Sequence, residues 1–334
     1  MKRNRVLTGD ARTRLRELPE SCVDTVCTSP PYFQLRDYGA RGQIGTEDSA
    51  DAWASRLRAV ATELARVLKP GGTWWLNLGD SFSRGGATGV PAKGLLLAPE
   101  RLLLGLAEDG WLIRNKVVWH KPNPVPTSAR DRLNTTWEPI YLLTRAPDYY
   151  FDLDAIRVPH ITRSVPAQTP PSDRPSGRPD WAGPLAGDQH GLALLRAEGR
   201  PGHPLGKNPG DVWQFAPTKR RGACLAPFPE GLVERTLRAS CPVAVCRQCQ
   251  RPWLRPVTRS LGALATKGEL APDCACEAPS RPGLVLDPFL GSGTTAVVAQ
   301  RLGLDWLGIE LRPDFARAAA ARLRAERTTG KEAA

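Results

Sequence analysis

Residues 284–295 of this chain read Leu284-Val285-Leu286-Asp287-Pro288-Phe289-Leu290-Gly291-Ser292-Gly293-Thr294-Thr295. An apolar run typical of a strand ends at Asp287, and a turn with two glycines follows it. Residues 294–302 then have the apolar spacing of a helix. In such a strand, tight loop and helix, glycines let a ligand lie against the backbone and the helix amides. The stretch therefore predicts an α/β fold with a ligand site at this loop.

A second strand follows that helix along the chain. Trp306-Leu307-Gly308-Ile309 is apolar and ends in Glu310, whose carboxylate is well placed to accept hydrogen bonds from ribose hydroxyls. The spacing resembles a dinucleotide-binding fingerprint, but the full G-x-G-x-x-G is missing. No lysine follows the glycines either, so a phosphate-binding P-loop is not expected.

An abrupt strand end also occurs near the amino terminus. Residues 22–27 alternate as a buried strand does, and Pro30 and Pro31 stop that strand between Ser29 and Tyr32. Because ligands bind at the carboxyl ends of strands in open α/β sheets, Ser29-Pro30-Pro31-Tyr32 predicts a second part of the site. A turn whose tyrosine caps the core is the alternative for this motif taken alone.

These four residues suit chemistry on the exocyclic amine of a nucleobase. The lone pair of that amine is delocalised into the ring, so the nitrogen is a poor nucleophile. Acceptors that hold both N–H bonds draw the nitrogen toward tetrahedral geometry and free the lone pair for attack. Ser29 offers a hydroxyl oxygen, Pro30 offers a backbone carbonyl, and Tyr32 offers a flat face on which an extruded base can stack.

As a pair, the sequences TSPPY (28–32) and DPFLGSGTT (287–295), with GIE (308–310) behind them, resemble the amino-methyltransferases of DNA that use S-adenosylmethionine. Their order, catalytic tetrad first and cofactor loop last, is that of the family's circularly permuted β class. The likeness covers residues 4–160 and 208–325. It implies a Rossmann-like, doubly wound, mainly parallel sheet of the class I methyltransferase type with permuted motif order.

The resemblance also implies the roles of individual residues. The catalytic residues are Ser29, Pro30, Pro31 and Tyr32. The residues that bind the cofactor are Asp10, Phe228, Asp287, Phe289, Gly291, Ser292, Gly293, Thr294 and Glu310. Two of these have an alternative: Asp10 can cap the helix expected over residues 11–18, and Phe228 can simply pack in the core.

The target atom follows from two features of the sequence. Methylation at ring carbon C5 of cytosine uses a cysteine that follows a proline in those enzymes, and none of the eight cysteines here does so. An exocyclic nitrogen is therefore expected. Relatives with serine at the first tetrad position, as at Ser29, mostly methylate cytosine N4, whereas those with Asp or Asn mostly methylate adenine N6. Cytosine N4 is the prediction, and adenine N6 is the alternative.

The charge of the chain predicts its partner. A net charge of +12 and a pI near 9.6 imply a polyanion, because lysine and arginine bind phosphates and release counterions; a solvated basic surface on an ordinary enzyme is the alternative. With the resemblance, the partner expected is double-stranded DNA, and a cognate restriction endonuclease is left open. No apolar run approaches a membrane span, and no signal-peptide core is present, so we expect a cytoplasmic protein. The oligomeric state is not predicted.

Strands and helices alternate over residues 1–119, which we expect to form the catalytic half of the methyltransferase domain. Its elements include a helix over 52–68 that Pro70-Gly71-Gly72 ends, and a strand from Thr73. Residues 120–209 are expected to be a partly disordered target-recognition region, with a plain linker over 163–206 as the alternative. Residues 210–240 return to the scaffold, 241–281 form a small zinc-ribbon-like insert, and 282–334 form the cofactor-binding half.

Five of the eight cysteines lie between residues 241 and 276. Two close pairs suggest tetrahedral zinc rather than disulfides in a cytosolic protein. The predicted ligands are Cys246, Cys249, Cys274 and Cys276, with Cys241 as a substitute. Cys22, Cys27 and Cys224 stand alone and are expected in the core.

Two functions from other classes compete with methyl transfer. A non-catalytic, zinc-containing DNA-binding protein would explain the charge and the cysteines, but not the paired motifs. An oxidoreductase would explain a glycine-bearing loop with Glu310, but not the tetrad. Titration of labelled S-adenosylmethionine against NAD separates the three readings.

Overall fold

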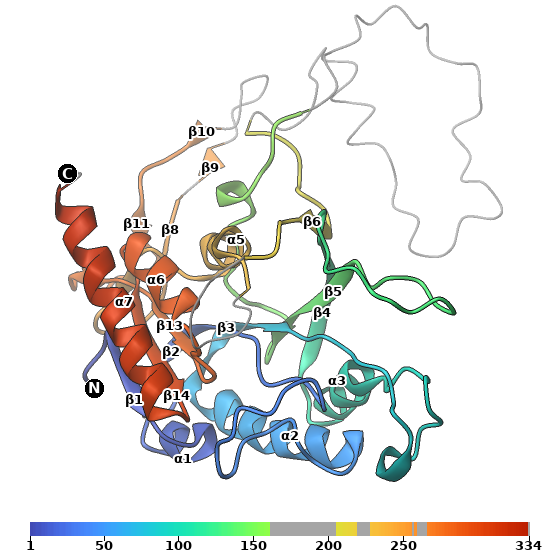
Figure 1. Ribbon diagram of the computed structural model, residues 1–334. Coiled ribbons are helices and arrows are strands. Elements are labelled where there is room, and N and C mark those ends of the chain that lie inside the picture. Colours follow the sequence, from blue (N-terminus) through green and yellow to red (C-terminus); the bar gives the residue numbers. More distant parts are fainter. Residues whose placement is uncertain (161–204, 219–227, 256, 259–265, 333–334) are drawn as a thin grey trace, which may run out of the picture.

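Eight strands form one mixed sheet at the centre of the protein (Figure 1). The computed structural model describes residues 1–160, 205–218, 228–255, 257–258 and 266–332. The strand order is β1-β14-β13-β2-β3-β5-β4-β6, and every neighbouring pair is parallel except the two that involve β5. The strands are β1 (Arg5–Thr8), β2 (Val23–Thr28), β3 (Leu68–Asn77), β4 (Leu112–His120), β5 (Trp137–Thr144), β6 (Val212–Gln214), β13 (Leu284–Asp287) and β14 (Asp305–Glu310). The predicted mainly parallel sheet is confirmed.

Helices cover both faces of this sheet. One face carries α1 (Ala11–Arg16), α2 (Ala50–Val67) and α3 (Ala98–Glu108), and the other carries α5 (Glu230–Ser240), α6 (Thr294–Arg301) and α7 (Pro313–Glu332). Short 3-10 helices span Gly86–Thr88 (η1) and Leu153–Ala155 (η2). Each layer of helices encloses its own cluster of buried apolar side chains, so the fold is doubly wound.

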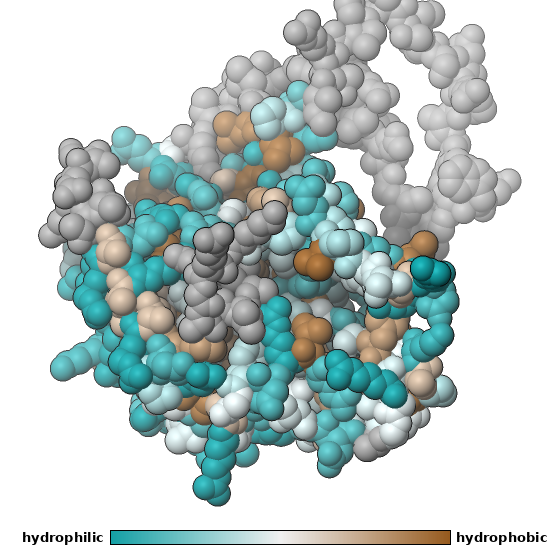
Figure 2. All heavy atoms as spheres, viewed as in Figure 1, coloured by the Kyte–Doolittle hydropathy of each residue, from teal (hydrophilic) through white to brown (hydrophobic). Residues whose placement is uncertain are grey.

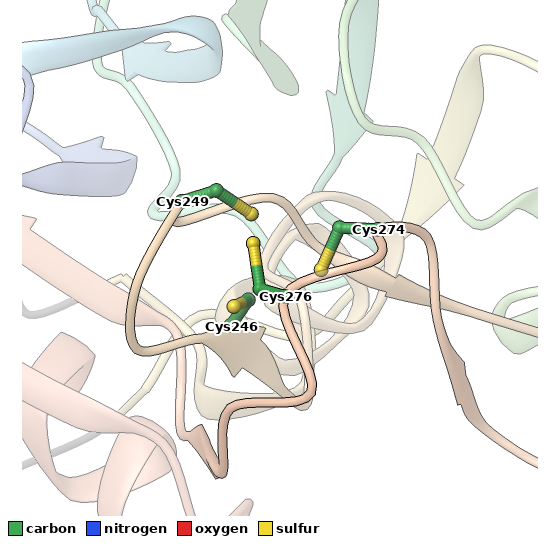
Figure 3. Close-up of side chains that lie close together, drawn as sticks. All are labelled: Cys246, Cys249, Cys274 and Cys276. Atoms are coloured by element: carbon green, nitrogen blue, oxygen red, sulfur yellow. The ribbon is translucent and has the colours of Figure 1, made fainter.

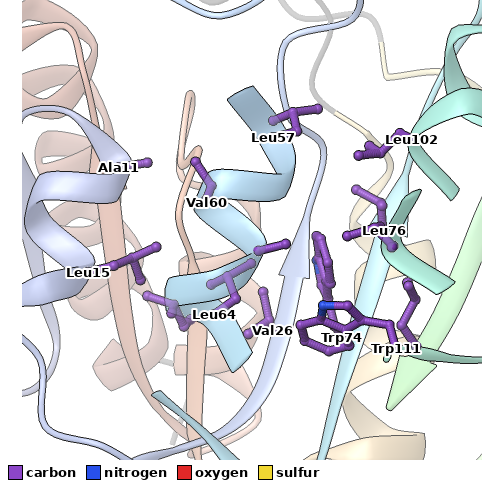
Figure 4. Close-up of a cluster of buried hydrophobic side chains, with 14 of the residues drawn as sticks. Ala11, Leu15, Val26, Leu57, Val60, Leu64, Trp74, Leu76, Leu102 and Trp111 are labelled. Carbon is purple, nitrogen blue, oxygen red and sulfur yellow. The ribbon is translucent and has the colours of Figure 1, made fainter. Parts of the chain in front are cut away.

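The sequence explains why α2 forms where it does. The Ser49 side chain caps the helix by accepting a hydrogen bond from a backbone amide of its first turn. Trp53, Leu57 and Leu64 recur on one face and are at most 4 % exposed. Figure 4 shows this face turned toward Val26 of β2. Burial of each of these side chains contributes roughly 1.5–3 kcal/mol, which fixes α2 against the strand that carries the tetrad.

The start of β3 differs from the prediction that Pro70-Gly71-Gly72 separates helix from strand. The backbone is already extended at Leu68, and β3 runs through the three residues. Its pairing with β2 changes register after Val23, so Pro70-Gly71-Gly72 lie in an irregular part of the strand. Proline and glycine are tolerated at such bulges. Pro70-Gly71-Gly72 can therefore follow the end of the helix and still form part of β3.

The predicted target-recognition region, residues 120–209, contains one strand of the central sheet. Strand β5 lies inside this range, yet it pairs with β3 and β4 within the sheet. Its residues from Pro139 to Thr144 are all buried, so hydrophobic burial holds this segment in the scaffold. Residues 161–204, which include most of the proline-rich stretch, lie outside the described residues, as does Cys224.

The segment between α5 and β13, for which we expect a small insert over residues 241–281, contains short strands in its described part. Its strands pair two residues at a time: β7 (Val245–Cys246) with β12 (Ser280–Arg281), β8 (Trp253–Leu254) with β11 (Ala271–Pro272), and β9 (Val257–Thr258) with β10 (Thr266–Lys267). The described residues contain no helix that is long and apolar enough to cross a membrane. In Figure 2, hydrophobic residues lie in small separate patches among hydrophilic ones.

Candidate functional site

A cavity of about 860 Å³ lies at the carboxyl edge of the parallel strands. The segment Ser29–Tyr32, which follows β2, lines one part of it, and Phe289–Ser292, which follow β13, line another. The two motifs lie 255 or more residues apart in the sequence, and the parallel pairing of β2 with β13 brings them together. This volume is within the range of small-molecule and cofactor sites.

Two tetrad residues, Ser29 and Tyr32, belong to a hydrogen-bonded chain. Ser29 Oγ donates to the hydroxyl oxygen of Tyr32 at 3.0 Å. The Tyr32 hydroxyl lies 3.0 Å from Asn77 Oδ1 and 2.9 Å from Glu138 Oε2, and can donate to either. Because the Ser29 hydroxyl donates its hydrogen bond to Tyr32, the lone pairs of the Ser29 oxygen remain available to accept a hydrogen bond from a ligand in the cavity.

The chain of hydrogen bonds ends at an ion pair between Glu138 and Lys121. Both side chains are less than one-fifth exposed, and both line the cavity. The Lys121 ammonium also lies 4.7 Å from the ring centre of Trp119, where a cation–π contact adds to its placement. The cavity therefore contains a carboxylate that is connected to Ser29 through a single tyrosine.

Sequence reasoning missed Asn77, Lys121 and Glu138. Asn77 is the last residue of β3, and Lys121 follows the last residue of β4. Glu138 is the second residue of β5, which runs antiparallel to its neighbours and so begins at the same edge. A search for polar residues at strand ends would have found the first two. Glu138 could be found only once the direction of β5 was known.

The surroundings of Tyr32 fix its ring and keep its hydroxyl neutral. Burial, together with the nearby Glu138 carboxylate, raises the pKa of Tyr32 well above its ordinary value. A Cβ on Gly79 would come within 2.5 Å of the Tyr32 ring, so only glycine allows this close approach. Trp53 Nε1 donates to the Pro31 carbonyl at 2.9 Å. By contrast, the Pro30 carbonyl accepts no hydrogen bond within the described part of the chain.

Asp287 connects the segment before Ser29 with the glycine-bearing loop through hydrogen bonds. It does not line the cavity. Its side chain is 1 % exposed and accepts hydrogen bonds from Thr28 Oγ1 at 2.6 Å and Thr295 Oγ1 at 2.7 Å. The backbone amide of Phe289 donates to it at 3.0 Å. Asp287 therefore positions the loop and the residue before Ser29, and its predicted contact with the cofactor stays a prediction.

The stability of the protein should depend on the titration of Asp287. Burial raises its pKa from 3.8 to about 6. The stability that its carboxyl contributes is therefore fully present below the unfolded pKa and is lost as pH rises through about 6. Asn at this position cannot titrate. Relative to Asp287→Asn, the wild type should lose about 2–3 kcal/mol of unfolding free energy between pH 4 and pH 7, as measured by urea unfolding. A difference that is constant with pH would contradict this assignment.

Glu310 holds the glycine-bearing loop from the neighbouring strand. One carboxylate oxygen accepts from the Gly291 amide at 2.8 Å, and the other accepts from the Arg312 amide at 2.9 Å. Burial raises the pKa of Glu310. Gly291 and Gly293 have φ angles of 51° and 82°, which glycine adopts at little cost. Glu310 also lines the cavity, where its remaining lone pairs can meet ligand hydroxyls.

The other predicted cofactor residues divide into two groups. Phe228, Phe289, Ser292 and Thr294 line the cavity, whereas Gly293 does not. Asp10 combines both roles considered for it, because it lines the cavity and its side chain caps α1 by accepting from the Thr13 amide at 2.9 Å.

The predicted metal ligands lie away from this cavity. Cys246, Cys249, Cys274 and Cys276 come together as one group, and Cys241 is not part of it. Cys241, Cys22 and Cys27 are buried, in agreement with the expectation that Cys22 and Cys27 belong to the core.

Comparison with known proteins gives consistent matches. The family model N6_N4_Mtase, described as DNA methylase, matches residues 23–321. The Type II methyltransferase M.SmaI of Serratia marcescens is 31 % identical over 96 % of this chain and 90 % of its own. The Type II methyltransferase M.SfiI of Streptomyces fimbriatus is 44 % identical, but the match spans 56 % of this chain and 45 % of that protein.

A solved structure shares the fold. The PvuII DNA methyltransferase (cytosine-N4-specific) superimposes with a TM-score of 0.59 and 16 % sequence identity. The match covers 95 % of this chain and 85 % of the PvuII chain. At this identity the likeness concerns the fold alone.

Proposed function

The chain belongs to the N6_N4_Mtase family of DNA methylases, and we propose that it methylates the exocyclic N4 amine of a cytosine extruded from DNA. Bound S-adenosylmethionine supplies an electrophilic methyl group. The cavity fits such a cofactor, because it combines a glycine-bearing loop, the Phe289 ring and the Glu310 carboxylate. The sequence motif alone does not show that these groups line one cavity.

The observation that carries the proposal is the hydrogen-bonded chain from Ser29 to Glu138. Ser29 Oγ and the Pro30 carbonyl are two acceptors on the cavity wall, and together they can hold both N–H bonds of an amine. The nitrogen is thereby drawn toward tetrahedral geometry, and its lone pair is freed for attack. This differential stabilisation of the transition state is what accelerates the reaction.

The same chain of hydrogen bonds can carry a proton from the amine to Glu138. When the nitrogen gains a methyl group it must lose a proton. Ser29 accepts that proton as it passes its own to Tyr32, and Tyr32 passes its proton to Glu138. Lys121 holds Glu138 in place by the ion pair. Because serine is a weaker proton acceptor than a carboxylate, the Glu138 end of the chain supplies the basic group that the tetrad itself lacks.

Cytosine N4 is preferred to adenine N6 because serine occupies the first tetrad position. The fold of the cytosine-N4-specific PvuII enzyme is compatible with this preference. Adenine N6 is the second candidate, since it presents the same pair of N–H bonds beside a ring nitrogen. A pocket that forms hydrogen bonds only with the exocyclic amine would accept either base.

We further propose that the substrate is double-stranded DNA and that the enzyme acts as the modification component of a Type II restriction-modification system, as its Type II relatives suggest. The net charge of +12 suits a polyanion. Residues 120–209 are the proposed recognition region. Within it, Arg130 is exposed and the Arg132 guanidinium stacks 3.7 Å from the centre of the Phe82 ring, which lines the cavity.

The proposal is tested by sequencing DNA from a host that expresses the protein, with a method sensitive to both N4-methylcytosine and N6-methyladenine. We expect N4-methylcytosine at one short sequence context. A host that expresses Ser29→Ala should carry far less of the mark, which excludes host enzymes as its source. N6-methyladenine at a fixed context would replace cytosine with adenine as the target, and the absence of any new mark would contradict DNA methylation.

A further inference from the structure

We propose that Cys246, Cys249, Cys274 and Cys276 bind one structural zinc ion. Their sulfur atoms all lie within 4.8 Å of one another, and none forms a disulfide. Figure 3 shows the four side chains converging from two separate loops. Sulfur ligands of a tetrahedral zinc ion lie about 3.8 Å apart, given Zn–S distances of about 2.3 Å. Small side-chain movements therefore suffice to complete the site.

The backbone at both cysteine pairs supports this assignment independently. The residue after the second cysteine of each pair is left-handed: φ is 62° at Gln250 and 49° at Glu277. This conformation is uncommon for residues other than glycine. At the first pair, the Gln250 amide donates to the Cys246 carbonyl at 3.0 Å and closes a tight turn. Each cysteine pair is thus followed by a residue in the same uncommon conformation, although the two loops differ in sequence.

The insert has almost no core of its own. Its fully buried residues all fall within 241–246, and every described residue from 247 to 281 whose exposure is given is at least partly exposed. Its strands are only two residues long. A segment of this size without a core needs another source of stability, and a metal ion that joins its two ends provides one.

The donor set selects the metal and its role. Four sulfur ligands without histidine or carboxylate favour zinc among common metals. Four protein ligands also fill the tetrahedron, so the ion has no open position for a substrate. None of the described residues between 241 and 281 lines the cavity. The insert is closed at its base by the Gly283 amide, which donates to the Pro242 carbonyl at 3.1 Å, directly before β13 begins. The ion therefore stabilises the connection from α5 to β13.

Metal analysis of the purified full-length protein tests this inference. Inductively coupled plasma mass spectrometry should find about one zinc per chain. Cobalt(II) that replaces zinc should give the visible absorption of tetrahedral cobalt and a sulfur-to-cobalt charge-transfer band. The double variant Cys249→Ser/Cys276→Ser should lose both the zinc and these bands. It should be cut by protease within 247–281 at a protein concentration and time at which the wild type resists.

The matched control is Cys22→Ala, which removes a buried cysteine outside the group and should keep the metal. Cofactor affinity of the zinc-depleted wild type should stay within about threefold of the loaded protein, which separates a structural ion from a catalytic one. Wild-type protein without metal, four sulfurs found as disulfides, or a double variant that retains zinc would each overturn the inference. None of these readouts depends on methyl transfer, so failure here would leave the proposed function untouched.

Discussion

Ser29→Ala should lower the rate of methyl transfer by about 10²–10³-fold while changing the affinity for S-adenosylmethionine by less than about twofold. The variant removes an acceptor that strengthens its hydrogen bond in the transition state, but it removes no group from the glycine-bearing loop. Tyr32→Ala should have an effect of similar size, because it removes both the ring and the link from Ser29 to Glu138. Single-turnover rates and cofactor titrations measure the two quantities separately.

Three further variants sharpen this prediction. Tyr32→Phe keeps the ring and removes only the hydroxyl, so its rate should fall less than that of Tyr32→Ala. Glu138→Gln keeps the shape and removes the proton acceptor, so its rate should also fall if the hydrogen-bonded chain carries the proton. Tyr149→Phe removes a tyrosine hydroxyl that contacts Arg114 outside the cavity, and should be as active as the wild type. A Ser29→Ala/Tyr32→Ala double variant with a rate within tenfold of wild type would refute the assigned tetrad.

Gly291→Val should weaken binding of S-adenosylmethionine about 100-fold or more. The φ of 51° at Gly291 is strained for a β-branched residue, and Gly291 is one of the residues that line the cavity. The substitution would also disturb the hydrogen bond from the Gly291 amide to Glu310. Isothermal titration calorimetry with S-adenosylmethionine measures the loss, which corresponds to about 2.7 kcal/mol or more.

Gly303→Val is the matched control for this variant. Gly303 also has a left-handed φ, of 70°, but a Cβ there would meet nothing within 4 Å, and the residue does not line the cavity. The Gly303 variant should lose stability from backbone strain and bind the cofactor as the wild type does. Equal affinities for Gly291→Val and wild type would remove the cofactor from this loop.

The sequence was sufficient for the parts of the fold that local patterns specify. The strand before Ser29, the strand, loop and helix around Asp287, and the strand ending in Glu310 all lie where the alternation and the glycines predict them. Strong local signals survive in the folded protein because burial in the sheet agrees with them. Both motifs follow the carboxyl ends of predicted parallel strands, so the sequence also predicts that they lie at one edge of the sheet.

Tertiary relations explain what the sequence could not provide. Glu138 reaches the tetrad only because β5 enters the sheet antiparallel between β3 and β4, a topology that no spacing within residues 120–144 reveals. Asp287 ends its strand as predicted, and its carboxylate turns inward to Thr28 and Thr295. A motif identifies which residue is present at a site, whereas the direction of its side chain depends on partners that lie far away in the sequence.

The central claim is that this chain methylates cytosine N4 in DNA. Its most direct test is incubation of the purified protein with unmethylated DNA and methyl-labelled S-adenosylmethionine, followed by digestion to nucleosides and mass spectrometry. We predict that the label appears in N4-methyl-2′-deoxycytidine and that Ser29→Ala protein, assayed in parallel, labels the DNA about 100-fold or more slowly. Label in N6-methyl-2′-deoxyadenosine, or DNA that stays unlabelled with a wild-type protein that binds the cofactor, would contradict the claim.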